Sequence, residues 1–320
     1  MIRNLVAASL LPSLLVLSSL ACAGEVPRTK SGRPDFSGNY DISNLTPWSR
    51  PKEFGDQRFL NDEQIAAIAE RQAGFVANDN RQLDPDRGAP DKAADPGAYN
   101  FFWLDFGTDA LPIDGKVRTS VIIDPPNGQM PAMTDAGKAR QGQIAQYDYW
   151  GKPKDVAWWM ETGDGPYNNL KTIVQTEDHV VINIEWMHHA RVIRLAKEGK
   201  KPEHLGDWYN IYGGDSVGWW EEDTLVVETT NIRDWPGSPR PGVYVVERFA
   251  PVEDKGLVYR FTVTDPDYTA PYTGELMWPR TDTFNYEFAC HEGNYSMGGM
   301  LRGARVLEQD WLEANGGAEE

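Results

Sequence analysis

The amino-acid sequence predicts a mainly β protein, an up-and-down antiparallel barrel with a few helices and long loop insertions. Three observations support this fold class. Segments rich in Val, Ile and Thr alternate apolar and polar residues from 171 to 231 and again from 243 to 292, a pattern typical of strands with one buried face. Short polar turns separate these segments, and about eight or nine such strands in succession suit a closed barrel. Neither a repeat nor a linker divides the chain, so we expect one domain.

Residues 1–23 are predicted to form a secretory signal peptide. Arg3 supplies the positive start, residues 5–20 the apolar centre, and Ala21-Cys22-Ala23 a small-residue cleavage site. We therefore expect export to the periplasm or the extracellular space. The alternative is a lipid anchor on Cys22, which Ser19 fits poorly.

Removal of this leader leaves a single barrel domain, residues 24–320, whose helical and loop insertions fall at about 45–170. Cys290 is then the one cysteine that remains, so the fold is expected to rest on its core and not on a disulfide. Within an apolar strand the Cys290 thiol is expected to stay protonated and inert.

The composition restricts the partners of the protein. A net charge of −17 repels nucleic acid and anionic lipid, so neither is expected to bind. The apolar run of the leader is too short for a comfortable membrane span, and no transmembrane segment is expected. Twelve Trp and thirteen Tyr residues supply rigid, flat groups for a core or for a ligand pocket. The expected partner is a small molecule, and the oligomeric state is not predicted.

The insertions are expected to contain two helices. The first begins with a capping box at residues 61–64 and is expected to end at Gly74. The second, weaker helix covers residues 134–146, where glycines lower the helix propensity. Residues 77–97 are polar and rich in Pro and Asp, which is typical of a loop.

The strands are expected in close succession. The first begins near Gly38, and a second covers residues 117–124. The later strand segments are 171–176, 179–196, 213–231, 243–250, 257–265, 274–280 and 285–292. The acidic tail, residues 311–320, is expected to be frayed.

Alternation within residues 185–192 divides one histidine pair between two faces. The more apolar set is expected to face the interior and consists of Trp186, His188, Ala190 and Val192. The other set, expected to form an exterior charged ladder, contains Glu185, His189 and Arg191. His188 is therefore the candidate proton-transfer group, and a core histidine bonded to a backbone carbonyl is the alternative.

A second candidate group lies at the end of the last expected strand. His291 and Glu292 are adjacent, and Gly293 lets the chain turn so that both can approach one end of the barrel. A histidine oriented by a carboxylate is a usable general acid or base. Asp215, which follows two glycines, is the other candidate for orienting a histidine. The alternatives are hydrogen bonds to neighbouring backbone and turn formation.

Other chemistries are less well supported. His188 and His291 with Glu292 or Asp215 could form a two-histidine, one-carboxylate metal site, but no tight ligand spacing favours it. The chain has no phosphate-cradling glycine loop, dinucleotide fingerprint, Cys-x-x-Cys pair or Gly-x-Ser-x-Gly elbow. We therefore expect neither a nucleotide cofactor nor a resident metal.

The substrate-binding candidates come from several segments. Arg118 and Asn231 are expected to position polar atoms, and Trp219 and Trp220 to form an apolar wall. A barrel interior that held Arg118, Asp215 and His291 would balance charge across a polar ligand. The remaining candidates, at the rim, are Tyr167, Asn168 and Tyr295. Turn formation is the alternative for Asn168.

Several motifs together resemble a large family of secreted bacterial proteins, most of them uncharacterised. The matching motifs are Gly32-Arg33-Pro34-Asp35-Phe36-Ser37-Gly38, Arg118-Thr119-Ser120, Asp124-Pro125-Pro126, Tyr167-Asn168-Asn169, Gly214-Asp215-Ser216, residues 185–191, residues 223–231 and Ala289-Cys290-His291-Glu292-Gly293-Asn294-Tyr295. In addition, Gly38-Asn39-Tyr40 resembles the Gly-x-Trp that opens lipocalin-like barrels, which implies a calycin-like fold.

The resemblance implies no established reaction, but it favours some candidate site residues over others. His188, Asp215, Asn231, His291 and Glu292 keep the family's residue types. His189 stands where the family has Asp, and Val217 and Trp219 stand where it has Arg. The loss of two cations beside Asp215 implies a more apolar or aromatic ligand.

The leading functional hypothesis is a secreted small-molecule enzyme that performs cofactor-independent acid–base chemistry. The reaction would be an elimination, hydration, isomerisation or hydrolysis of an aromatic, terpenoid or glycosidic substrate. The alternative is a periplasmic, lipocalin-like protein that binds an apolar ligand without turnover. A structural surface module is a third hypothesis, which leaves the ionisable residues without a role.

Overall fold

The structure is a computed structural model. It describes residues 26–79, 105, 107–144, 169–185, 189–211, 213–233, 240–253, 255–287, 289 and 296–315. The predicted signal peptide lies outside these residues. No helix in the described ranges is both long and apolar enough to cross a membrane.

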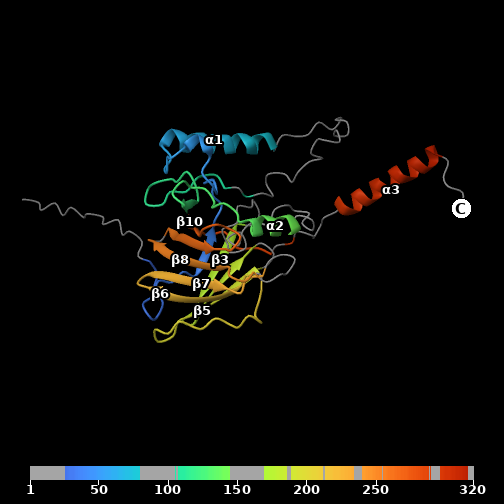
Figure 1. The fold of residues 1–320 in the computed structure, drawn as a ribbon. Helices are drawn as coiled ribbons and strands as arrows, with labels where there is room; N and C mark the ends of the chain where they lie inside the picture. The colour runs from blue at the N-terminus through green and yellow to red at the C-terminus, as the bar shows by residue number, and fades with distance from the viewer. Residues whose placement is uncertain are drawn as a thin grey trace, which may run out of the picture.

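Nine strands close into a mixed β-barrel, which confirms the predicted mainly β barrel (Figure 1). The strands, in order around the wall, are β1 (Gly38–Asp41), β3 (Leu170–Gln175), β4 (His179–Ile184), β5 (His189–Leu195), β6 (Asp215–Glu221), β7 (Thr224–Thr230), β8 (Tyr244–Val252), β9 (Gly256–Thr264) and β10 (Tyr272–Thr281). Pairing of β1 with β10 closes the barrel. A short strand, β2 (Ile122–Asp124), pairs with β10 beside this seam.

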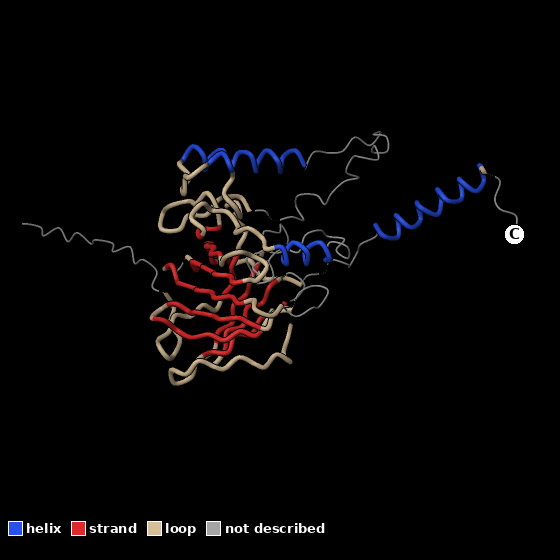
Figure 2. Tube along the Cα trace, viewed as in Figure 1, coloured by secondary structure: helices blue, strands red, loops and turns tan. Residues whose placement is uncertain are grey.

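One neighbouring pair departs from the predicted antiparallel pattern. β5 and β6 are parallel, with Ile193 opposite Ser216, and parallel neighbours need a crossover connection. Residues 196–214 provide it by returning along the outside of the wall (Figure 2). We call this segment the crossover. The register is held at its start by the Ala196 amide, which donates to the Gly218 carbonyl over 2.8 Å.

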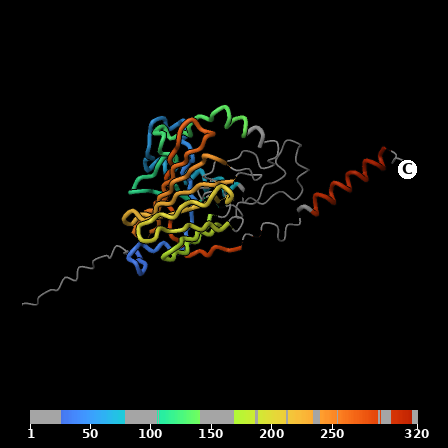
Figure 3. The backbone as a smooth tube through the Cα atoms, turned by 60° about the horizontal axis from the view of Figure 1, so that its bottom comes forward, coloured from blue at the N-terminus to red at the C-terminus, as the bar shows by residue number. Residues whose placement is uncertain are grey.

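The two ends of the barrel differ. Residues 26–37, the strap, cross one end of the barrel (Figure 3). Phe36 of the strap packs on Trp220, with 5.3 Å between the ring centroids. Tyr40 in β1 lies beneath Arg280, whose guanidinium is 5.3 Å from the ring centroid. The opposite end, the far end, is marked by the strand residues Asp41, Leu170, Ile184, His189, Asp215, Thr230, Tyr244, Thr264 and Tyr272.

The interior next to the strap is a packed aromatic core. Trp278, Tyr259 and Phe249 are buried, and Tyr259 lies 4.9 Å from both of the other rings. Phe261 and Tyr272 continue the stack toward the far end. Offset and tilted rings of this kind stabilise a core beyond their buried area. This half of the barrel is filled by its own side chains.

The two predicted helices are present. α1 (Asp62–Asp79) starts with the expected capping box, in which the Asn61 and Gln64 amides donate to each other's side chains over 2.9 and 2.8 Å. It continues past Gly74, because one glycine costs only about 1 kcal/mol in a helix interior and does not terminate it. α2 (Asp135–Ile144) is capped by the Thr134 hydroxyl, and η1 (Lys52–Phe54) is a short 3₁₀ turn.

The C-terminal prediction was wrong in two respects. Of the strand expected at 285–292, residues 285–287 and 289 are described and form no strand, since β1 already pairs with β3 and β10; the other residues of that segment lie outside the described ranges. The tail forms α3 (Ser296–Ala314), an exposed helix that stands apart from the barrel in Figures 1 and 3. Likewise, only Ile122–Asp124 of the strand expected at 117–124 pairs as a strand.

Candidate functional site

A polar network lies inside the barrel between the aromatic core and the far end. Arg191 and Glu247 form an ion pair in which two guanidinium nitrogens face two carboxylate oxygens, one pair at 2.9 Å. Arg191 also donates to the Ser216 and Thr229 hydroxyls over 3.0 and 2.9 Å. Tyr259 donates to Glu247 over 2.8 Å. All five residues are buried, or belong to the core, so the network is screened from water.

The inner and outer faces predicted for β5 are wrong, because the network places Arg191 inside. Arg191, Ile193 and Leu195 point inward, whereas Ala190 and Val192 are exposed, Val192 by 52%. The prediction placed the more apolar set of side chains inside, because it assumed an apolar interior. The buried ion pair puts a charged side chain on the inner face of β5 instead. Arg191 is therefore an interior residue and not part of an exterior ladder. The alternation argument for His188 loses its basis, and His188 itself lies outside the described residues.

His189 belongs to the inward set and opens β5 at the far end. Burial, followed by the nearby cations Arg191 and Lys171, lowers the pKa of His189 from its ordinary value of 6.5. The His189 ring packs against the backbone at Gly213, which has no side chain. A Cβ at Gly213 would lie only 2.7 Å from the Nε2 of His189. A partly buried imidazole held neutral at pH 7 can accept a proton.

Two further ionisable groups lie at this end. Lys171 of β3 is buried and pairs across the sheet with Ile184, next to the end of β4. The pKa of Asp105 is raised by burial and by the neighbouring Asp41 carboxylate. The far end thus combines a neutral histidine, two cations and a carboxyl group that is easier to protonate than usual.

Asp215 lies on the other side of the wall, in contact with the crossover. Both carboxylate oxygens are 2.9 Å from Arg194, the His204 Nδ1 is 2.9 Å away, and the Leu205 amide donates over 2.8 Å. Burial alone would raise the pKa of Asp215, but the hydrogen bonds from Leu205, His204 and Arg194 outweigh it and lower the pKa. Asp215 is an anchor for the crossover.

His204 connects two carboxylates in this outer cluster. Its Nε2 is 3.0 Å from Glu228, while Nδ1 faces Asp215. The ring thus bridges a residue of β6 and a residue of β7. Lys201 and Tyr244 also contact Glu228. We call Asp215, His204, Glu228, Lys201 and Arg194 the outer clamp.

The predicted meeting of Arg118 and Asp215 inside the barrel was wrong. Arg118 lies outside the wall, where its Nε donates to Glu275 of β10 over 2.9 Å. Trp219 and Trp220 do not form one wall, because adjacent strand residues face opposite sides. Trp219 lies outside under Lys201, and Trp220 packs inside against Phe36.

Asn231 supports the crossover. It takes a left-handed conformation with φ of 55° at the end of β7, and its side-chain amide donates to the Leu205 carbonyl over 2.8 Å and toward that of Gly206. Asn231 therefore joins Asp215 in holding one segment. No sequence pattern identified His204, because the crossover lacks the periodicity that would place this residue on a face.

The other predicted site residues lie outside the described residues: His188, His291, Glu292, Tyr167, Asn168 and Tyr295. Within the described ranges, no three His, Cys, Asp or Glu side chains gather in a way that could hold a metal ion.

Comparisons with protein-family models, with curated proteins and with solved structures found no match to this chain.

Proposed function

We propose that the protein binds a small molecule at the far end of its barrel and transforms it by acid–base chemistry without a nucleotide cofactor. In this proposal His189 accepts a proton from the bound molecule. The observation that carries this proposal is an imidazole with a lowered pKa, beside two interior cations, at the end of a barrel whose other half is packed. Neighbouring groups that shift a pKa in this way are common at catalytic sites.

The mixed charges at the far end favour a ligand with a strongly polar group. Arg191 and Lys171 are the cations there, and Glu247, Asp105 and Asp41 carry the carboxyl groups. A low-dielectric wall strengthens the field of these groups. An aromatic, terpenoid or glycosidic substrate that carries such a group fits better than a purely apolar ligand.

The network also supports a catalytic role for Arg191. Hydrogen bonds to Glu247, Ser216 and Thr229 fix the guanidinium before any ligand arrives. Preorganised cations stabilise negative charge as it develops on a substrate. Proton removal by His189 with charge stabilisation by Arg191 and Lys171 suits an elimination, a hydration or an isomerisation.

The proposal also includes export of the protein and three further candidate catalytic residues. The leader at residues 1–23 supports secretion. His188, His291 and Glu292 are proposed as further proton-transfer groups, and their alanine variants belong in the same assay series.

Substitution His189→Gln tests the proposal, with His179→Gln as the matched control because His179 is exposed at the strap end of β4. Small aromatic and sugar carboxylates are first screened for those that raise the unfolding temperature, and turnover is then followed by NMR. We expect His189→Gln to lower kcat by about 10²–10⁴-fold, with binding retained and the control unaffected. The acid limb of kcat/KM is expected below pH 6.5, because the pKa of His189 is lowered.

Two results would contradict this assignment. Unchanged turnover in His189→Gln would exclude this residue as the base. Binding without turnover by the unmodified protein across the screen would favour the alternative, a binding protein.

A further inference from the structure

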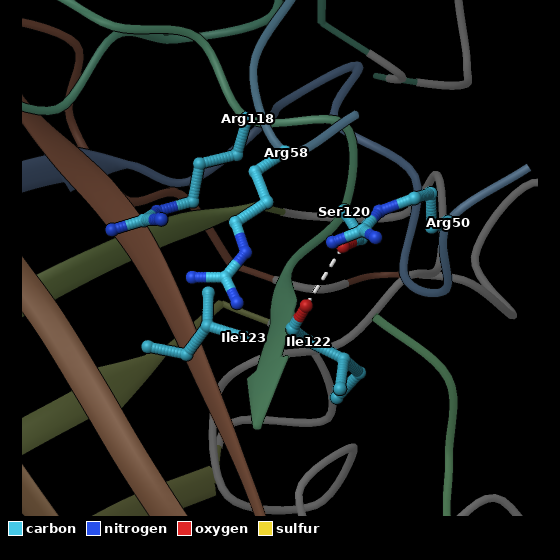
Figure 4. A pocket seen from close by; sticks show the side chains of 6 residues that line it. All are labelled: Arg50, Arg58, Arg118, Ser120, Ile122 and Ile123. Atoms are coloured by element: carbon cyan, nitrogen blue, oxygen red, sulfur yellow. Dashed lines mark hydrogen bonds between the residues drawn. The ribbon is translucent and has the colours of Figure 1, made fainter. Parts of the chain in front are cut away.

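A separate pocket lies outside the barrel wall, beside β2 and β10. Its volume is about 180 Å³, and its lining consists of Arg50, Arg58, Arg118, Ser120, Ile122 and Ile123. Figure 4 shows Arg58 extending between Arg118 and Arg50, above Ile123. Among the residues that the structure describes, three guanidinium groups and no carboxylate therefore line this small pocket.

Arg50 is a buried cation, and its side-chain hydrogen-bond acceptors within the described ranges are all neutral. Its side chain donates to the Thr119 hydroxyl over 3.0 Å and to the Gly55 and Pro126 carbonyls over 3.3 and 3.2 Å, and the residue is 6% exposed. These bonds use three of the five N–H groups of a guanidinium. A buried charge without a counter-ion is costly, and an anion in the pocket would offset that cost.

The backbone around Arg50 holds it in place. The Arg50 amide donates to the Gly128 carbonyl over 2.8 Å, and Gln129 donates to the Arg50 carbonyl over 2.7 Å. Gly128 has a φ of 70°, and a Cβ there would lie 2.6 Å from the Ser120 hydroxyl and 2.9 Å from the Arg50 Cβ. Close approach of this loop thus requires glycine, and it fixes two of the lining residues.

The carboxylate nearest to Arg118 is shared. Glu275 accepts from Arg118 over 2.9 Å and from Arg260 over 2.8 Å. Arg58 is exposed, and its side chain makes no hydrogen bond or ion pair with any residue that the structure describes. Four guanidinium groups against one carboxylate leave a local surplus of three positive charges, in a chain of net charge −17.

We propose that this pocket binds a small oxyanion, a phosphate or carboxylate group, through Arg50, Arg58 and Arg118. Planar guanidinium groups match both kinds of oxyanion with paired hydrogen bonds. The volume lies below the roughly 300 Å³ at which pockets for drug-sized ligands begin, so the ligand is an inorganic anion or a small organic acid. The site is distinct from the one at His189, because Arg118 contacts Glu275 outside the wall, whereas His189 belongs to the inward set of β5.

Isothermal titration of the purified full chain tests the pocket, with inorganic phosphate and benzoate as separate probes in a low-salt buffer free of both groups. At least one probe is expected to bind with a dissociation constant below about 1 mM and to bind more weakly as NaCl is added. The probe that binds identifies the group. Failure of both probes to bind would overturn the proposal.

The decisive variant is Arg58→Gln, because the Arg58 side chain is exposed and has no hydrogen bond or ion pair to lose in the part of the chain that the structure describes, so the fold should be retained. It is expected to weaken binding about tenfold, the value of one charge-assisted hydrogen bond. The control is Arg305→Gln, since Arg305 is exposed on α3, away from the barrel. Equal weakening by both variants would show non-specific attraction and would refute a site at the pocket.

Discussion

Two charged clusters occupy opposite sides of the same strand. Ser216 of β6 faces inward and joins the Arg191–Glu247 network, while the preceding residue, Asp215, faces outward and joins the outer clamp. The interior carboxylate of Glu247 has no exposure to water, whereas the clamp includes partly exposed side chains. The strength of an ion pair therefore depends on which face of the strand carries it, because burial removes the alternative partner, water.

The largest effect is expected when the interior network loses one charge. Glu247→Gln leaves Arg191 buried without its carboxylate, and breaking a buried pair in this way costs about 3–5 kcal/mol. Urea unfolding followed by tryptophan fluorescence should show a midpoint shift with little change in slope.

A double variant separates lost charge from lost packing. Arg191→Met with Glu247→Leu removes both charges and keeps apolar volume, and it is expected to be more stable than Glu247→Gln. A double variant as unstable as the single one would show that the network stabilises by shape and not by charge balance.

A smaller effect is expected in the outer clamp. Asp215→Asn keeps the size of the side chain but removes the charge that Arg194 and His204 contact, and should cost about 1.5–3 kcal/mol. Asp223→Asn is the control, because the Asp223 pair with Arg28 is exposed and should contribute little.

The unfolding free energy of Asp215→Asn is also expected to depend on pH differently from that of the unmodified protein. The folded pKa of Asp215 lies below its ordinary value of 3.8, so its contribution is present above pH 3.8 and is lost as the pH falls through the folded pKa. Unfolding free energies measured at decreasing pH should show an acid loss that Asp215→Asn lacks. Parallel curves for the two proteins would mean that the carboxylate does not stabilise the clamp.

The smallest effect is expected at the edge of the clamp. Lys201 contacts Glu228 and lies 4.9 Å from the Trp219 ring centroid, but its side chain is 41% exposed. Lys201→Ala should therefore cost about 0.5 kcal/mol and less in high salt. A loss of unfolding free energy as large as that of Asp215→Asn would show that the exposed contacts of the clamp stabilise the fold as much as the buried ones.

Local features followed from the sequence. The barrel class, the capping box at Asn61 and Gln64, and the helix at Asp135–Ile144 all follow from residue type and short-range spacing. The candidate site did not follow in the same way. Arg191 and His189 were assigned to the outside because alternation assumes an apolar interior, and β5 carries its ion pair on the inner face.

Long-range pairing explains the other misassignments. His204 meets Asp215 because the parallel pairing of β5 and β6 sends the crossover back over the outer wall, and no local pattern specifies that path. The strand expected at residues 285–292 has no partner strand over its described residues 285–287, because β1 already pairs with β3 and β10.

That the chain builds a strand-rich barrel follows from its residues alone, since alternation and turn chemistry act over a few residues. The motif Arg118-Thr119-Ser120 is also visible there, and two of its residues line the arginine pocket. Which charges face inward, which histidine lies at the far end, and which arginines surround one pocket are set by the folded chain. Those outcomes depend on register and closure, which arise from contacts between residues far apart in the chain.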